Sequence, residues 1–332
     1  MGGSNILKRQ WFSPLPQPSP IEGEGVLGRC IRTETALARS VKLDRRIKLA
    51  PAVVFAVALA LSGCELAVLD PRGPVAAQEK QILVDSLAIM LAIVIPTLIA
   101  IVAFAWWFRA GNTHARRRQD FIYSGQIELV VWSIPALTVL LLAGVIWIGS
   151  HRLDPAAPIE GEGEPIEIDV ISLDWKWLFL YPDRKLASIN QLVVPIGAPL
   201  YLRLTSASVM TAFFVPQWGS MIYTMNGMTS HLNLRADAAG EFMGLASNLS
   251  GEGFSEMKFA ARAVSPQAFA KWAKDAAEGA PFDEAAYRGL QQQGTAAASA
   301  QPLADPKLFE KIVSQKLPPG PGPVSRLKTA VN

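Results

Sequence analysis

Two long apolar segments dominate the first half of the chain. Residues 86–108 and 129–149 contain no charged side chain. Because an α-helix rises about 1.5 Å per residue, each segment is long enough to cross a hydrocarbon core of about 30 Å. Tryptophans lie near one end of each segment, as is typical of membrane interfaces. The pattern predicts a two-helix transmembrane hairpin over residues 82–149; the alternative is the buried hairpin of a soluble protein.

After residue 165 the hydrophobic period changes from that of a helix to that of a strand. Ile166, Ile168 and Val170 alternate with the polar residues between them. Further strand candidates follow, separated by Pro, Gly, Asn and Asp: "WLFLY", "QLVV", "LYLRLTS", "TAFFVP", "SHLNLRA" and "EMKFAARAV". Several short strands with regular turn signals favour a Greek-key β-sandwich over residues 150–264.

The remaining residues, 265–332, predict two short helices and a disordered tail. The helix candidates are "SPQAFAKWAKDAAE" and "DPKLFEKIVSQK", and the Pro/Gly-rich "PPGPGP" follows them. The expected fold class is therefore membrane α plus all-β, a transmembrane hairpin followed by a sandwich.

Composition favours a membrane protein, and the distribution of charge predicts its topology. Hydrophobic residues make up 50% of the 332 residues and charged residues 18%, which is apolar for a soluble protein. The net charge of +3 is too small to indicate a nucleic-acid partner. The loop 109–125 carries Arg109, Arg116, Arg117 and Arg118 against the single acid Asp120. By the positive-inside rule this loop is cytoplasmic, which places residues 64–81 and everything from residue 150 in the periplasm.

The N-terminal region has the features of a lipoprotein signal. Four basic residues precede the apolar run 49–61, which is too short to span a membrane, and "LSGC" ends it at Cys64. This ending resembles a bacterial lipobox, and the resemblance implies cleavage of a signal peptide, residues 42–63, and a covalent lipid on Cys64. The alternative is a free cysteine in a short apolar segment. Residues 1–41 do not fit a signal peptide, so we interpret them as an extension upstream of the true translation start.

The segment 244–257, "GLASNLSGEGFSEM", has the spacing of a copper-binding loop. In the pattern C-x-E-x-C-x-x-x-H-x-x-M the ligand positions fall on Ala246, Asn248, Ser250, Phe254 and Met257. Only Met257 retains a donor, and a lone thioether is a weak ligand. A thiolate-bridged copper pair needs cysteine sulfurs, and the chain has only Cys30 and Cys64. Met257 is therefore expected to be a packing residue.

The chain resembles subunit II of the haem–copper respiratory oxidases. The lipobox, the two spans with a basic loop, "DWKWLFLYPD" and "VMTAFFVPQWGSMIYTMNGM" carry the resemblance, which covers roughly residues 42–280. The nearest match is subunit II of the bo-type ubiquinol oxidases, which implies a cupredoxin-like fold for the sandwich. The histidine position of the family stretch H-x-F-x-V-P matches Thr211, so this copper ligand is missing too.

The missing ligands indicate the electron donor. A water-soluble cytochrome needs an exposed metal centre to receive its electron, whereas quinol dissolved in the bilayer reaches a membrane subunit directly. The resemblance thus implies a proton-pumping ubiquinol oxidase of the bacterial inner membrane, with haems and the remaining copper in subunit I. This chain would then carry no catalytic residue and no metal site. It would support assembly of the complex, cap the outer surface of subunit I and supply one proton-entry group. The alternatives are a cytochrome c oxidase subunit II and a non-enzymatic cupredoxin-like lipoprotein.

Four further residues have expected roles. Glu128 begins the second span on the cytoplasmic side, where an ionisable side chain is costly and marks proton paths; the resemblance matches it to a family acid near a proton channel of subunit I. The alternative is an interfacial carboxylate paired with an arginine of the inner loop. Trp175 and Trp177 are expected on one face of a strand, packing against a neighbouring subunit. His231 is expected to be a surface strand residue.

Overall fold

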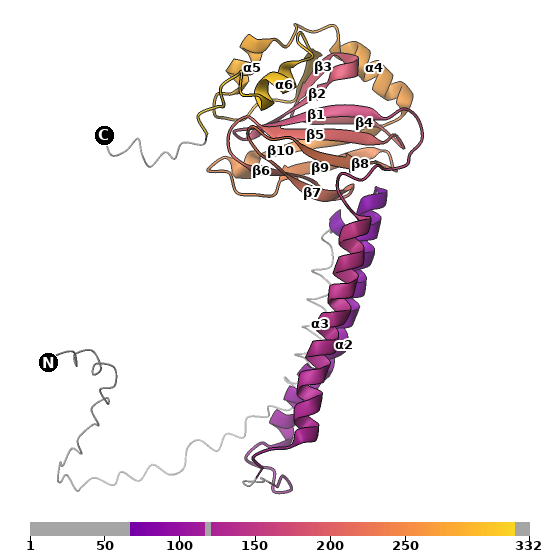
Figure 1. The fold of residues 1–332 in the computed structure, drawn as a ribbon, viewed down its shortest axis with the longest axis vertical. Coiled ribbons are helices and arrows are strands. Elements are labelled where there is room, and N and C mark those ends of the chain that lie inside the picture. The colour runs from indigo at the N-terminus through magenta and orange to yellow at the C-terminus, as the bar shows by residue number, and fades with distance from the viewer. Residues whose placement is uncertain (1–66, 117–120, 323–332) are drawn as a thin grey trace, which may run out of the picture. The chain divides into compact units, whose positions relative to one another are not determined.

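The computed structural model describes residues 67–116 and 121–322 (Figure 1). The proposed extension 1–41, the signal peptide 42–63 and the lipidation site Cys64 all lie outside the described residues. The same holds for residues 117–120 of the basic loop and for the end of the chain after residue 322.

Two long helices form the predicted hairpin. They are α2 (Pro74–Trp107) and α3 (Gly125–Arg152), and each contains one proline, Pro96 or Pro135. Their most apolar windows have mean hydropathies of 2.9 and 2.4 and are 0% buried in the structure. The alternative of a buried soluble hairpin is therefore wrong. The helix α2 begins at Pro74, well before the apolar segment that starts at residue 86.

The sandwich consists of two sheets. A six-stranded sheet has the order β11-β3-β2-β1-β5-β8, and a five-stranded sheet has the order β4-β10-β9-β6-β7. The pairs β1–β5 and β4–β10 are parallel, and the other pairs are antiparallel. The strands are β1 (Ile166–Leu173), β2 (Lys176–Tyr181), β3 (Leu186–Ile189), β4 (Gln191–Pro195), β5 (Leu200–Ser206), β6 (Thr211–Val215), β7 (Gly219–Thr224), β8 (Ser230–Leu234), β9 (Gly240–Ala246), β10 (Lys258–Val264) and β11 (Ser299–Pro302).

The main core lies between the two sheets. Trp177, Phe179 and Phe213 are fully buried there, and Phe259 stacks on Phe213 with ring centroids 5.3 Å apart. The hydroxyl of Tyr181 closes one edge, since it donates to the carbonyl oxygen of Val193 (2.9 Å) and accepts from its N–H (3.0 Å). These buried aromatic rings explain why the "WLFLY" and "TAFFVP" segments form central strands.

The segment after residue 264 is part of the folded domain. The two predicted helices are α4 (Pro266–Ala276), which is capped by Ser265, and α6 (Leu308–Val313). A third helix, α5 (Glu284–Leu290), was not predicted. Unlike the expectation of helices and a tail alone, β11 extends the six-stranded sheet by pairing with β3. This strand was not predicted, because "SAQP" has neither apolar alternation nor a β-branched residue.

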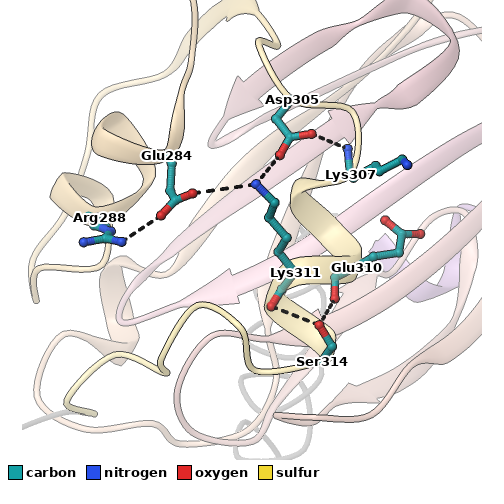
Figure 2. A network of polar contacts seen from close by, with 7 residues as sticks. All are labelled: Glu284, Arg288, Asp305, Lys307, Glu310, Lys311 and Ser314. Atoms are coloured by element: carbon teal, nitrogen blue, oxygen red, sulfur yellow. Dashed lines mark hydrogen bonds and ion pairs between the residues drawn. The ribbon is translucent and has the colours of Figure 1, made fainter.

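Ion pairs join the C-terminal helices (Figure 2). The ammonium of Lys311 lies 2.7 Å from Asp305 and 3.7 Å from Glu284, which also pairs with Arg288 at 2.7 Å. Beneath them, Leu308, Phe309 and Ile312 of α6 are buried in a second core formed with the outer face of the six-stranded sheet. The apolar contacts fix α6, because exposed ion pairs contribute little to stability.

Candidate functional site

The residues at the copper-ligand positions lie at one end of the sandwich. Thr211 begins β6, Ala246 ends β9, and Ser250 follows in the loop. A 3-10 turn then carries Phe254 and leads to Met257, whose carbonyl oxygen accepts a hydrogen bond from the N–H of Ala246 (3.0 Å). The chain thus keeps a closed loop at this end although the ligand side chains are absent.

Packing fills this loop. Met257 is 1% exposed and Ala246 3% exposed, and both belong to the main core, against which Phe254 also packs. The hydroxyl of Ser250 lies 3.8 Å from the Met257 sulfur, and Asn248 makes only a 3.5 Å contact with the carbonyl oxygen of Met210. The prediction that Met257 is a packing residue is confirmed.

The donor chemistry does not fit a copper pair. These positions offer two hydroxyls (Thr211 and Ser250), one carboxamide (Asn248) and the Met257 thioether, but none of the thiolates and imidazoles that hold a copper pair. The Thr211 hydroxyl is buried with no hydrogen-bond partner among the described residues, and Thr224 bonds instead to Ser172 at 2.7 Å. Within residues 67–116 and 121–322 no three His, Cys, Asp or Glu side chains gather as a metal site would need.

The expectation for the two tryptophans is wrong. Trp175 lies in the turn between β1 and β2 with a φ of +69°, so it does not share a strand face with Trp177. Its ring covers Gly253, where a Cβ would collide with it, and its indole N–H donates to the carbonyl oxygen of Ser250 (3.2 Å). Trp177 is fully buried in the main core. Trp177 therefore packs inside this domain, and the half-buried Trp175 covers the neighbouring loop. The expected strand face does not exist because a two-residue turn separates β1 from β2.

Glu128 lies in the first turn of α3 with an exposed side chain. Its main-chain N–H donates to the carbonyl oxygen of Ser124 (3.0 Å). Its carboxylate forms no ion pair with any residue that the structure describes, and neither Arg109 nor Arg116 is a partner. His231 is exposed in β8, which confirms the surface expectation.

The structure contains a buried charge pair that the sequence did not predict. Asp169 of β1 is fully buried and accepts two hydrogen bonds, of 2.7 and 2.9 Å, from the guanidinium of Arg203 on β5. Burial raises the pKa of Asp169 to about 6, although Arg203 acts in the opposite direction. Arg203 also lies over the ring of Phe309 and pairs with Glu310 at 3.1 Å. It therefore joins β1 and β5 to α6, a link that strand periodicity could not reveal.

A second missed contact joins the first helix to the sandwich. The N–H of Ala76 donates to the carbonyl oxygen of Trp218 (3.2 Å), and the Glu79 carboxylate accepts from the N–H and hydroxyl of Ser220. Gly219 has a φ of +107° and leaves no space for a Cβ against Ala76. The start of α2 is thus docked on the edge strand β7.

Seven large apolar side chains of residues 153–322 are exposed: Val209, Met210, Met221, Tyr223, Met228, Met243 and Leu249. Met221 and Tyr223 of β7 and Met243 of β9 belong to the five-stranded sheet, and we name these three the apolar face. The other four lie in loops. The hydroxyl of Ser247 lies 2.7 Å from the Met221 sulfur, so β7 and the loop after β9 meet here. Exposed apolar side chains on one face of a sheet are typical of an interaction surface.

The fold and site define a class. Residues 162–264 match the family model for the periplasmic domain of cytochrome c oxidase subunit II. Two apolar helices followed by this sandwich fit the architecture of a terminal-oxidase subunit II.

The relatives are more specific. Ubiquinol oxidase subunit 2 of Acetobacter aceti is 41% identical over 266 residues, which cover 78% of this chain and 85% of that protein. Cytochrome bo(3) ubiquinol oxidase subunit 2 of Pseudomonas putida is 40% identical, with 77% and 82% covered. The solved periplasmic domain of cytochrome oxidase subunit II of Bradyrhizobium japonicum is 26% identical, covers 35% of this chain and 94% of that chain, and gives a TM-score of 0.33. The chain belongs to the ubiquinol oxidase subunit 2 family.

Proposed function

We propose that this chain is the copper-free second subunit of a proton-pumping complex that oxidises ubiquinol and reduces oxygen to water. The observation that carries the proposal is the replacement of the ligand set: Thr211, Ala246, Ser250 and Phe254 stand where a copper centre needs histidine and cysteine. Without that centre the outer domain cannot relay an electron from a soluble cytochrome. Quinol can instead reach the haem-bearing subunit I from the bilayer, and that subunit holds the haems and the remaining copper.

The chain supports the complex through contacts. The apolar face lies on the same sheet as β7, where the sandwich meets α2, so a partner embedded in the same membrane can cover it. We infer that this partner is subunit I and that the sandwich caps its outer surface. The two helices, whose apolar side chains are exposed, are free to pack against its membrane helices and against lipid.

The topology follows from charge and the expected lipid. The basic loop 109–125 is cytoplasmic, and the sandwich is in the periplasm of a bacterial inner membrane. Acyl chains on Cys64 would add a second anchor, since each buried methylene contributes about 0.8 kcal/mol. A Cys64→Ser variant should then leave the signal peptide uncleaved and incorporate no labelled fatty acid, whereas labelling equal to the parent protein would refute lipidation.

A copper titration of the purified chain tests the ligand argument. The parent protein should show no absorption band of a thiolate–copper pair and no stoichiometric binding at micromolar copper. The matched control restores Cys at positions 246 and 250 and His at positions 211 and 254, and it should gain copper absorption if the loop geometry is kept. Stoichiometric copper binding by the parent protein would overturn the quinol assignment.

A further inference from the structure

A small cavity lies where the outer ends of both membrane helices meet the sandwich. Its volume is about 280 Å3, and its walls come from the first turn of α2, the segment from Arg152 to Glu160 after α3, and residues of β7 and β8. Pro74, Val75 and Leu153 give it an apolar side. The proposed function leaves this cavity without a role.

The cavity lies at the depth of lipid headgroups. Trp147, which is 68% exposed, lies five residues before Arg152 on α3, so Arg152 is about 7.5 Å further along the helix axis. Interfacial tryptophans mark the edge of the hydrocarbon core, and the headgroup layer beyond it is about 5 to 7 Å thick. The guanidinium of Arg152 is therefore level with the phosphate groups of the outer leaflet.

Among the described residues, the cavity holds one arginine and two carboxylates that form no ion pair. Neither the guanidinium of Arg152 nor the carboxylate of Glu160 forms an ion pair or a side-chain hydrogen bond with any residue that the structure describes. The other arginine of the cavity, Arg235, is held by Asp237 at 2.6 Å and by the main-chain oxygen of Glu160. Asp154 accepts the N–H of Ala156 on Oδ1 (3.0 Å), which leaves its other carboxylate oxygen without a hydrogen bond among the described residues. Arg152, Glu160 and Asp154 are thus the charged groups available to a ligand, with Glu160 as the acid that carries no hydrogen bond on its carboxylate.

We propose that this cavity binds the headgroup of a zwitterionic phospholipid that carries a phosphate and a primary ammonium. The Arg152 guanidinium donates to the phosphate oxygens, as its planar fork suits, and the Glu160 carboxylate accepts from the ammonium. The acyl chains run down the exposed apolar sides of α2 and α3. The proposal rests on the membrane topology given above, but not on the nature of the electron donor.

Native mass spectrometry of the delipidated, assembled complex tests the site, with phosphatidylethanolamine and phosphatidylglycerol added back as probes. Arg152→Gln should weaken the tightest phosphatidylethanolamine site about tenfold. Glu160→Gln should weaken phosphatidylethanolamine but leave phosphatidylglycerol unchanged. Arg184→Gln, which removes an exposed arginine of another element, is the matched control and should change neither.

Three results would overturn the proposal. These are an unchanged lipid affinity in Arg152→Gln, an equal loss in Arg184→Gln, and displacement of the lipid by millimolar inorganic phosphate, which would identify a free-anion site. The ubiquinol oxidase rate of the parent complex is measured separately, so a failure of the proposed function is distinguishable. All variants should keep that rate, because neither Arg152 nor Glu160 is assigned to electron or proton transfer.

Discussion

Met257 shows at the scale of one residue how a ligand position becomes part of a core. Its sulfur lies near the Ser250 hydroxyl and its side chain is fully enclosed. The sequence predicted this outcome because cysteine is missing from the domain. The sequence could not predict which side chain covers the loop. Trp175 reaches Gly253 only because its own φ is positive, which a local pattern does not reveal.

A pair of substitutions at Met257 separates packing from ligation. Met257→Leu conserves volume and should cost less than about 1.5 kcal/mol of unfolding free energy, whereas Met257→Ala should cost about 2–5 kcal/mol. Denaturant unfolding measures both, and the quinol oxidase rate of the folded complexes should not change. A rate that falls equally in both variants would instead indicate a functional sulfur.

Glu128 is the residue at which proton entry is tested. Glu128→Gln keeps the shape and removes the charge, so the complex should assemble with its haems but turn over severalfold more slowly. Glu241→Gln, an exposed carboxylate of the sandwich, is the control. Oxygen consumption with ubiquinol between pH 6 and 9 measures the effect, and equal rates in parent and variant would leave Glu128 a structural role only.

Asp169 makes stability depend on pH in an unusual direction. The pKa of its carboxyl is about 6 in the folded state, whereas in the unfolded state it has the ordinary value of 3.8. Between these two pH values the folded state therefore binds more protons than the unfolded state. Stability from this group therefore rises as pH falls from 7 to 4, by up to about 3 kcal/mol, and is lost as pH rises. Asp169→Asn cannot take up the proton, so the parent should gain stability relative to the variant over this range. A parent-to-variant difference that stays constant or shrinks would contradict the assignment.

At the scale of elements, the strands with apolar alternation were predictable and the others were not. The two predicted spans correspond to α2 and α3, and seven strand candidates correspond to β1, β2, β4, β5, β6, β8 and β10. The strand β9 was missed because Gly244 interrupts its pattern, and the ring of Phe259 occupies the space where a Cβ would lie. The strand β7 was missed because it is an edge strand covered by α2 rather than by the opposite sheet.

The C-terminal elements should be required for the stability of the outer domain. A soluble fragment of residues 153–322 keeps β11 and α6, whereas one that ends at residue 290 loses the burial of Leu308, Phe309 and Ile312. At about 1.5–3 kcal/mol for each buried side chain, the shorter fragment should lose at least about 4 kcal/mol. Denaturant unfolding compares them, with a fragment that ends at residue 318 as control. Equal stability of the fragments that end at 290 and 322 would show that the second core contributes nothing.

At the scale of the whole molecule, the sequence predicted the order of the helices and the sandwich, but it did not predict the contact that joins them. Periodicity and charge predicted a membrane hairpin followed by an outer sandwich. The docking of α2 on β7 through Glu79 and Ser220 joins residues far apart in the chain, and no local pattern reports such a contact. This attachment holds the start of the first helix against the sandwich.

Oxygen consumption by the purified complex distinguishes ubiquinol from a soluble cytochrome as the electron donor. The complex that contains this chain should consume oxygen with ubiquinol and should show no comparable rate with reduced cytochrome c, since Ala246, Ser250 and Phe254 offer no relay. Rapid oxidation of cytochrome c in the absence of quinol would contradict the account.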